Sequence, residues 1–154
     1  VGAGTVLLGR MSDDVFTDRF GREPVEPLAG RFEMWQRFQV ERYLDYHGTK
    51  LSRRFDANSY LLLTKAMDLH DLARGRGGLE SALGRISAPL LAMGVSSDIL
   101  YPDYQQQELV EGVAAAGGRA AYHHIDSPHG HDAFLIDTDQ VAAALVPFLE
   151  GDLP

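Results

Sequence analysis

The sequence predicts an α/β fold in which parallel strands alternate with helices, and three observations lead to this class. A continuous apolar run from Ala88 to Val95 is typical of a buried parallel strand. A second strand-like segment, RAAYHHI at 119–125, follows at a separation that leaves room for one crossover helix. Each strand ends in a polar loop that leads into a helical pattern. Residues 86–154 are therefore predicted to form a strand, a helix, a strand and a helix with parallel pairing.

The first half of the chain is predicted to be mostly helical. Ser12 is placed to cap a short helix that runs to Phe20. A longer apolar period from Phe32 to His47 predicts a second helix, and Gly48 is expected to end it. A third helix is expected from Ser59 to about residue 72. Because several faces of this third helix are apolar, it is either buried on several sides or in contact with another chain.

Three helices are predicted in the second half. A short one spans Leu79 to Arg85, just before the first strand. The next begins at Pro102 and Asp103, where Asp103 is expected to cap the helix and Gln106 to complete a capping box. A last helix begins at about Thr138, and Pro147 is expected to kink or shorten its final turn. Its residues predicted to pack inward are Val141, Leu145 and Phe148.

A histidine and an aspartate are predicted to meet at the carboxyl edge of the two strands. Asp98 lies just past the end of the first strand, and His131 lies beyond the second strand, behind the turn at Gly130. Functional groups gather at this edge of open α/β sheets because the strands are rigid and the loops are free to vary. A carboxylate there can fix the tautomer of a histidine and stabilise its cation. Asp98 and His131 are therefore candidate catalytic residues.

Composition excludes several classes of function. The chain has 154 residues and no cysteine, so it has neither disulfides nor thiol chemistry. Its formal charge of −8 argues against a nucleic-acid partner. We find no apolar run of transmembrane length and no clear signal peptide, so a cytoplasmic location is the expectation.

A metal site is the alternative interpretation of the segment around His131. Four histidines and two aspartates occur within ten residues of this segment. Imidazole and carboxylate are common metal ligands, but no comparable motif upstream supplies the further ligands that such a site needs. We therefore expect no metal. The six residues of this segment are His123, His124, Asp126, His129, His131 and Asp132.

Three segments together carry a resemblance to a known family. They are RFQVERYLDYHGTKLSRRFDANSYLLLTKAMDLHD at 37–71, SSDILYP at 96–102 and GHDAFLID at 130–137. In this order they resemble the C-terminal half of homoserine O-acetyltransferases, which belong to the α/β-hydrolase superfamily. The resemblance covers roughly residues 18–150. It implies the C-terminal part of an α/β-hydrolase fold together with a helical lid.

The resemblance also implies a domain plan and an activity. Residues 1–30 would be an irregular connection, residues 31–78 a helical lid with a possible dimer contact, and residues 79–154 the part of the core that carries the triad's Asp98 and His131. The family moves an acetyl group from acetyl-CoA to the hydroxyl of L-homoserine, in methionine biosynthesis, through an acyl-serine intermediate. Asp132, beside the histidine, would bind the amino group of homoserine. No tightly bound cofactor is implied.

The family's nucleophile is missing from this sequence. None of the eight serines lies in a G-x-S-x-G elbow, which normally also positions the oxyanion hole. The nucleophile is therefore expected to lie outside this chain, in an N-terminal half, and the chain alone is expected to be inactive. Alternatives within the family are transfer to serine or another alcohol, use of succinyl-CoA, or ester hydrolysis. An alternative of another class is an inactive fragment that acts only as a lid or dimerisation module.

Overall fold

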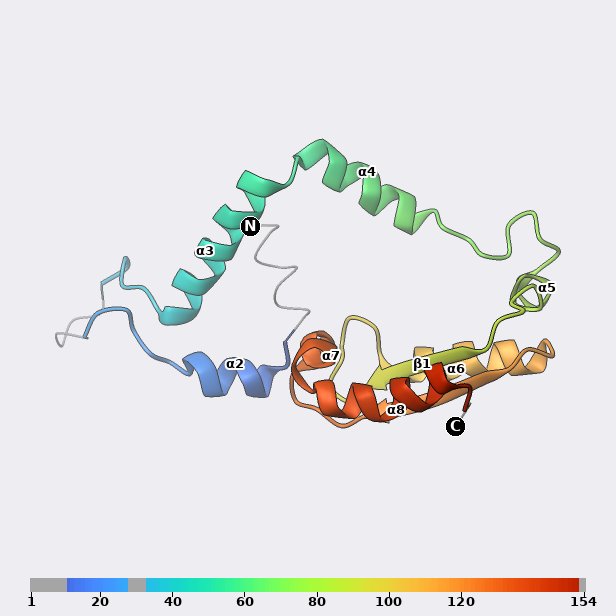
Figure 1. Cartoon of the computed structure of the whole chain (residues 1–154). Helices are drawn as coiled ribbons and strands as arrows, with labels where there is room; N and C mark the ends of the chain where they lie inside the picture. Colours follow the sequence, from blue (N-terminus) through green and yellow to red (C-terminus); the bar gives the residue numbers. More distant parts are fainter. Residues whose placement is uncertain (1–10, 28–32, 153–154) are drawn as a thin grey trace.

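The computed structural model describes residues 11–27 and 33–152 (Figure 1). The predicted connection at 1–30 and the start of the predicted lid therefore lie partly outside the described residues. In chain order the described elements are α2 (Asp13–Phe20), α3 (Gln39–Arg54), α4 (Ala57–Asp68), α5 (Leu79–Leu83), β1 (Leu90–Val95), α6 (Asp103–Ala115), β2 (Ala120–Ile125), the 3-10 turn η1 (Gly130–Asp132), α7 (Ala133–Ile136) and α8 (Thr138–Glu150).

Two parallel strands form the sheet of the described chain. β1 pairs with β2 from Leu90 opposite Ala120 to Val95 opposite Ile125, so their carboxyl ends are level. This confirms the predicted parallel unit. β1 begins two residues later than predicted because Pro89 has no N–H to donate, and the ladder starts where the Leu90 N–H reaches the carbonyl of residue 119 at 2.9 Å.

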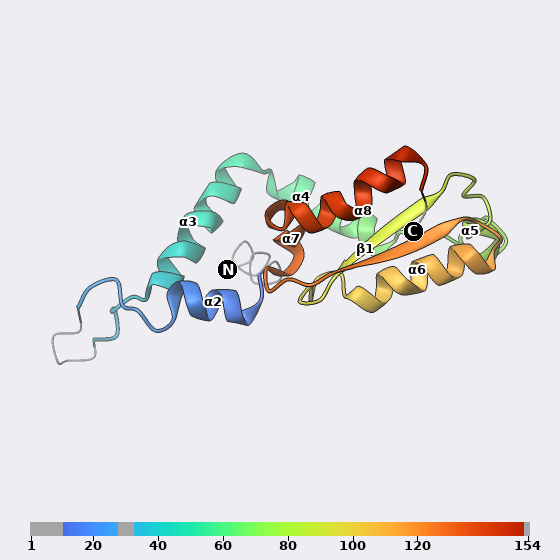
Figure 2. The same ribbon diagram turned by 60° about the horizontal axis from the view of Figure 1, so that its bottom comes forward.

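The helices of the second half cover both faces of the sheet. α6 and α8 lie on opposite sides of the two strands, as Figure 2 shows. On one face Val113 of α6 is fully buried, and on the other Val95, Ile125 and Ala133 form a small core against which Val141 packs. These apolar contacts hold the carboxyl ends of β1 and β2 rigid.

The first half forms an arch of helices that extends away from this layered part (Figure 1). α2 confirms the predicted cap, since the Ser12 hydroxyl accepts a hydrogen bond from the Val15 N–H at 3.3 Å. At the end of the arch, the loop after α4 returns the chain to α5 and β1.

The predicted boundaries of α3 are wrong at both ends. Before Gln39, Met34 and Trp35 lie in a turn. The next residues pair with the chain near Pro24, because the Val25 N–H donates to the carbonyl of residue 37 at 2.7 Å and Pro24 forms a bridge with Phe38. The Glu41 carboxylate then accepts the Phe38 N–H at 2.6 Å, which fixes the helix start. Gly48 lies inside α3 and does not end it. The cost of about 1 kcal/mol for one interior glycine is not enough to end a helix of 16 residues.

α4 begins earlier than predicted and is exposed over much of its surface. Asp56 caps it by accepting the Ser59 N–H at 2.8 Å, and this bond holds the pKa of the Asp56 carboxyl below its usual value. The exposed fractions of Leu61 and Leu62 are 66% and 71%. The helix was predicted either to be buried on several sides or to contact another chain. Burial within the described chain is wrong, and contact with another chain stays a prediction.

Asp103 does not cap α6, which corrects the prediction for this residue. The N-cap position is Pro102, and the Asp103 carboxylate instead accepts hydrogen bonds from the Tyr122 hydroxyl and from Gln107 Nε2, the latter at 3.2 Å. Burial, together with the nearby Asp103, raises the pKa of Tyr122 to about 12. The predicted capping box with Gln106 is accordingly not formed. A β-carbon at Gly94 would lie 2.0 Å from Asp103 Oδ1, so only glycine fits there.

The last helix is longer and less buried than predicted. α8 continues through Pro147 to Glu150 and ends at Gly151, whose φ is 102°. Ala144 is the buried residue on its inner face, whereas Leu145 is 38% exposed. The prediction that Leu145 packs inward is therefore wrong for the described chain. Among the described residues, we find no helix long and apolar enough to cross a membrane.

Candidate functional site

Asp98 occupies a tight turn directly after β1. Its backbone N–H donates to the Val95 carbonyl at 3.1 Å, and its Oδ1 accepts the N–H groups of Leu100 at 2.8 Å and Tyr101 at 2.9 Å. The side chain is only 5% exposed. These two backbone donors fix one carboxylate oxygen and direct the other toward His131.

His131 lies in η1, the 3-10 turn that follows β2. Gly130 precedes it with a φ of 61°, a left-handed conformation that glycine adopts without strain. The His131 Nδ1 lies 2.8 Å from Asp98 Oδ2, and the imidazole ring packs between Tyr101 and Phe134 at centroid distances of 5.0 and 5.6 Å. The side chain is 28% exposed. With Nδ1 directed to Asp98, Nε2 is the nitrogen that can exchange a proton with a substrate.

Three serines join the two loops that carry this pair, and sequence reasoning did not assign them this role. Ser97 Oγ accepts the Gly130 N–H at 2.9 Å and donates to the Ser127 carbonyl at 2.5 Å. Ser96 Oγ accepts the Ser127 N–H at 3.0 Å, while the buried Ser127 hydroxyl donates to Asp137 at 2.5 Å. In the sequence, serines follow both strands, with Ser96 and Ser97 after β1 and Ser127 after β2. These bonds fix Asp98 and His131 relative to each other.

The α2 helix is attached to the same loop. The Ser12 hydroxyl donates a hydrogen bond to the Pro128 carbonyl, three residues before His131. Phe16 and Phe20 of α2 pack against Tyr43 of α3, with the Phe20 and Tyr43 ring centroids 5.0 Å apart. A continuous series of contacts therefore connects α3 through α2 to the loop of His131.

The other residues of the histidine-rich segment have separate surroundings. His124 Nδ1 lies 3.4 Å from Asp103 Oδ2, and the Asp126 main chain is bonded to the Gln140 side chain. Asp132 directly precedes α7, and its side chain does not cap that helix. Within residues 11–27 and 33–152, no group of three potential ligands is arranged to hold a metal ion. The geometry of His131 against Asp98 is of the kind that supports proton transfer.

The residues that follow His131 are only partly buried. Ala133 is fully buried, but Phe134 and Leu135 are 45% and 62% exposed. Phe134 uses one side of its ring against His131. Its exposed apolar surface therefore belongs to the surroundings of the candidate site and not to the core.

Solved structures define the class of this fold. A crystal structure of homoserine O-acetyltransferase from Bacillus anthracis matches 92% of this chain and 38% of its own, with a TM-score of 0.77 and 22% identity. A crystal structure of an esterase matches 96% of this chain and 42% of its own, with a TM-score of 0.76 and 22% identity. The described structure has the fold of one part of an α/β-hydrolase.

Sequence comparison identifies relatives within that class. The homoserine O-acetyltransferases of Moorella thermoacetica and Symbiobacterium thermophilum are 50% and 52% identical to this chain, over 139 and 142 residues respectively. Both alignments cover 90% of this chain, which spans only 37% of the length of either relative. The chain is a homologue of part of the homoserine O-acetyltransferases. We found no family model that matches it.

Proposed function

We propose that the protein carrying this chain transfers an acetyl group from acetyl-CoA to the hydroxyl of L-homoserine. The observation that carries the proposal is the pair formed by Asp98 and His131 at the carboxyl edge of the sheet, joined at 2.8 Å. Relatives about half identical to the chain bear the name of this activity. Acetyl-CoA would be a co-substrate and not a bound cofactor, and a cytoplasmic location belongs to the same proposal.

In the proposed mechanism His131 moves one proton in each half-reaction. Its Nε2 takes the proton of a serine hydroxyl supplied from outside this chain, the serine oxygen bonds to the acetyl carbon, and the thiol of coenzyme A leaves with the proton. His131 then takes the proton of the homoserine hydroxyl, whose oxygen attacks the acyl-serine, and returns it to the serine. Asp98 stabilises the imidazolium in both steps.

The pair of Asp98 and His131 would serve three other reactions equally well. The acceptor could be serine or another alcohol, the donor could be succinyl-CoA, or water could replace the acceptor and make the protein an esterase. All four reactions pass through an acyl-serine, acetyl or succinyl according to the donor, and all use the same proton carrier, so the pair itself does not distinguish them. Asp132 is the residue proposed to bind the amino group of homoserine, a group that water and simple alcohols lack.

Kinetics with each substrate separately tests this proposal. The active protein is expected to acetylate homoserine, and Asp132→Ala is expected to raise the KM for homoserine while leaving the rate of acyl-enzyme formation from acetyl-CoA within about twofold. Asp139→Ala, an exposed carboxylate in the first turn of α8, is the matched control. Hydrolysis of simple esters without transfer to any alcohol would contradict the transferase. If Asp132→Ala slowed both half-reactions equally, the role of Asp132 would be structural.

A second candidate function is assembly, and the exposed apolar surface of α4 favours it. We propose that residues 31–78 act as a lid through which two copies of the chain associate. A hollow of about 480 Å³ at the junction of α3 and α4 adds apolar surface from Leu51, Phe55, Tyr60 and Leu61. Exposed apolar surface of this kind is usually covered by a partner. If the active site is absent, this association would be the function that remains.

Mass measurement in solution tests the association. The chain is expected to have twice its monomer mass, and Leu62→Glu is expected to make it monomeric because a buried, unpaired carboxylate would oppose contact. Leu149→Glu is the matched control, since Leu149 on α8 is 72% exposed and lies outside α4. A wild-type monomer, or a Leu62→Glu dimer, would exclude α4 as the contact.

A further inference from the structure

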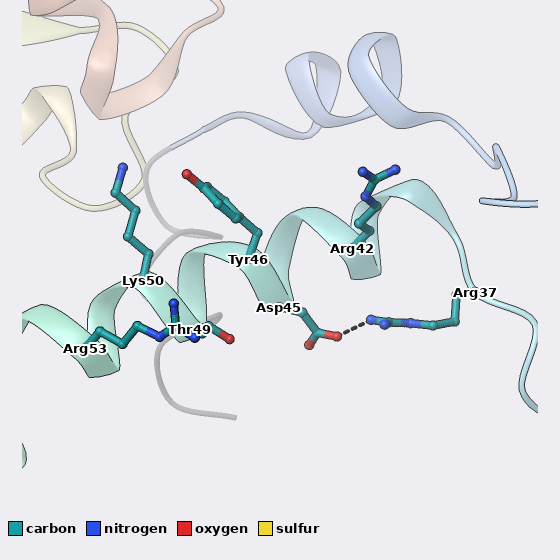
Figure 3. A pocket seen from close by; sticks show the side chains of 7 residues that line it. All are labelled: Arg37, Arg42, Asp45, Tyr46, Thr49, Lys50 and Arg53. Carbon is teal, nitrogen blue, oxygen red and sulfur yellow. Dashed lines mark hydrogen bonds and ion pairs between the residues drawn. The ribbon is translucent and has the colours of Figure 1, made fainter.

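A basic hollow lies on α3, away from the pair of Asp98 and His131. It has a volume of about 520 Å³. Four cationic side chains, one carboxylate, one hydroxyl and one aromatic ring line it (Figure 3). These residues are Arg37, Arg42, Asp45, Tyr46, Thr49, Lys50 and Arg53. We define this set as the α3 hollow.

The charge of the α3 hollow opposes that of the whole chain. Four cations and one carboxylate give it a net charge of +3, whereas the chain has a formal charge of −8. Within the described residues, Asp45 pairs with Arg37. Lys50 and Arg53 stand three residues apart on the helix, a spacing at which like charges destabilise a helix by a few tenths of a kcal/mol. A bound anion would remove this repulsion.

The types of side chain in the α3 hollow suit a phosphate-bearing ligand. Arginine offers a planar fork of donors to phosphate oxygens, lysine a compact charge, and Thr49 a hydroxyl donor. The Tyr46 ring is 60% exposed and has the Lys50 ammonium 5.8 Å from its centroid. An exposed ring among cations can stack on a nucleobase whose phosphates the cations bind.

We propose that the α3 hollow binds the nucleotide phosphates of the acyl donor. This inference rests on the proposed function, in which the donor is a coenzyme A thioester. In Figure 3 the side chains of Arg42, Tyr46 and Lys50 project to the side of α3 on which α2 is drawn. α2 in turn contacts the loop of His131 through Ser12 and Pro128. Phosphates held on α3 would thus be held on an element that is attached to the catalytic loop.

Two donors that differ in their phosphates test the proposal in the active protein. The variant replaces three cations of the hollow together, Arg42→Gln, Lys50→Gln and Arg53→Gln. Its KM for acetyl-CoA is expected to rise on the order of tenfold, because three exposed charge pairs with phosphate are lost. No such rise is expected with S-acetylpantetheine, which delivers the same acetyl thioester without nucleotide phosphates, or in the KM for homoserine. The wild-type KM for acetyl-CoA should also rise with salt.

A control variant removes the same number and kinds of cation elsewhere. It carries Lys65→Gln, Arg85→Gln and Arg119→Gln, three exposed residues outside the hollow, and its KM values are expected to match wild type. Equal KM changes in both variants, or an equal rise with both donors, would overturn the α3 hollow as a phosphate site.

Direct binding separates this proposal from the proposed function. If the wild-type protein transfers no acyl group, the proposed acyltransferase function is wrong. Calorimetry with coenzyme A still tests the α3 hollow in that case. Tight binding of coenzyme A that the triple variant weakens would support the hollow. Equal binding of coenzyme A by wild type and triple variant would overturn it.

Discussion

Replacing His131 with alanine is expected to abolish acyl transfer by the active protein. In triads the loss of the proton carrier lowers the rate by factors on the order of 10⁴ or more. His131 is the residue in the described site whose ring nitrogen contacts Asp98 while 28% of the side chain stays exposed to a substrate. The loss should therefore fall on kcat, with KM values little changed. Steady-state kinetics on the purified variant measures both constants.

His124→Ala is the matched control for this experiment. His124 lies on β2, is half exposed, and pairs with Asp103 at the start of α6 instead of Asp98. Its loss is expected to leave kcat within about threefold of wild type, since an exposed pair of this kind contributes little. A circular dichroism spectrum like that of wild type should accompany both variants. Activity of His131→Ala within tenfold of wild type would remove His131 from the chemistry.

The parts of the fold that were predicted correctly are those that local pattern determines. The apolar run before Asp98 and the strand before His131 gave a parallel pair, and parallel pairing brings the two carboxyl ends to one edge. Because Asp98 and His131 each follow one of these strands, the sequence predicted that they lie close together. Ser12 at the start of α2 was equally local, because a cap needs only the next turn of its own helix.

The errors lie where a residue's partner is distant in sequence. Asp103 has the sequence signature of a helix cap, but Tyr122, nineteen residues later, takes its carboxylate. The serines of the two loops bond across about thirty residues, so no local pattern reveals their role. Tertiary contacts override propensity in each of these cases.

The missing nucleophile follows from a different cause. A catalytic serine is recognised by its strand-turn-helix elbow, and the sequence has no such motif. The chain spans 37% of the length of the relatives it matches, so their remaining residues have no counterpart here. The described residues provide the pair of His131 and Asp98, to which the proposed mechanism gives the roles of proton carrier and orienting carboxylate.

Asp98→Asn is expected to lower kcat by about 10⁴, although it changes one atom. The N–H groups of Leu100 and Tyr101 both point at Oδ1, so the asparagine must place its carbonyl oxygen there. Its amide nitrogen then takes the position of Oδ2, 2.8 Å from His131 Nδ1. An amide donor in that position requires Nδ1 to accept, which leaves the proton on Nε2. The histidine would therefore be held in the tautomer that cannot act as a base.

The double variant of Asp98→Asn and His131→Ala distinguishes this explanation from a loss of structure. Because Asp98 acts through His131, the double variant should be no slower than His131→Ala alone. Asp126→Asn, an exposed carboxylate in the loop after β2 that bonds Ser96, is the control and should stay within a fewfold of wild type. Rates that fall by the product of the two single losses would mean that Asp98 and His131 act independently, and the tautomer argument would then be wrong.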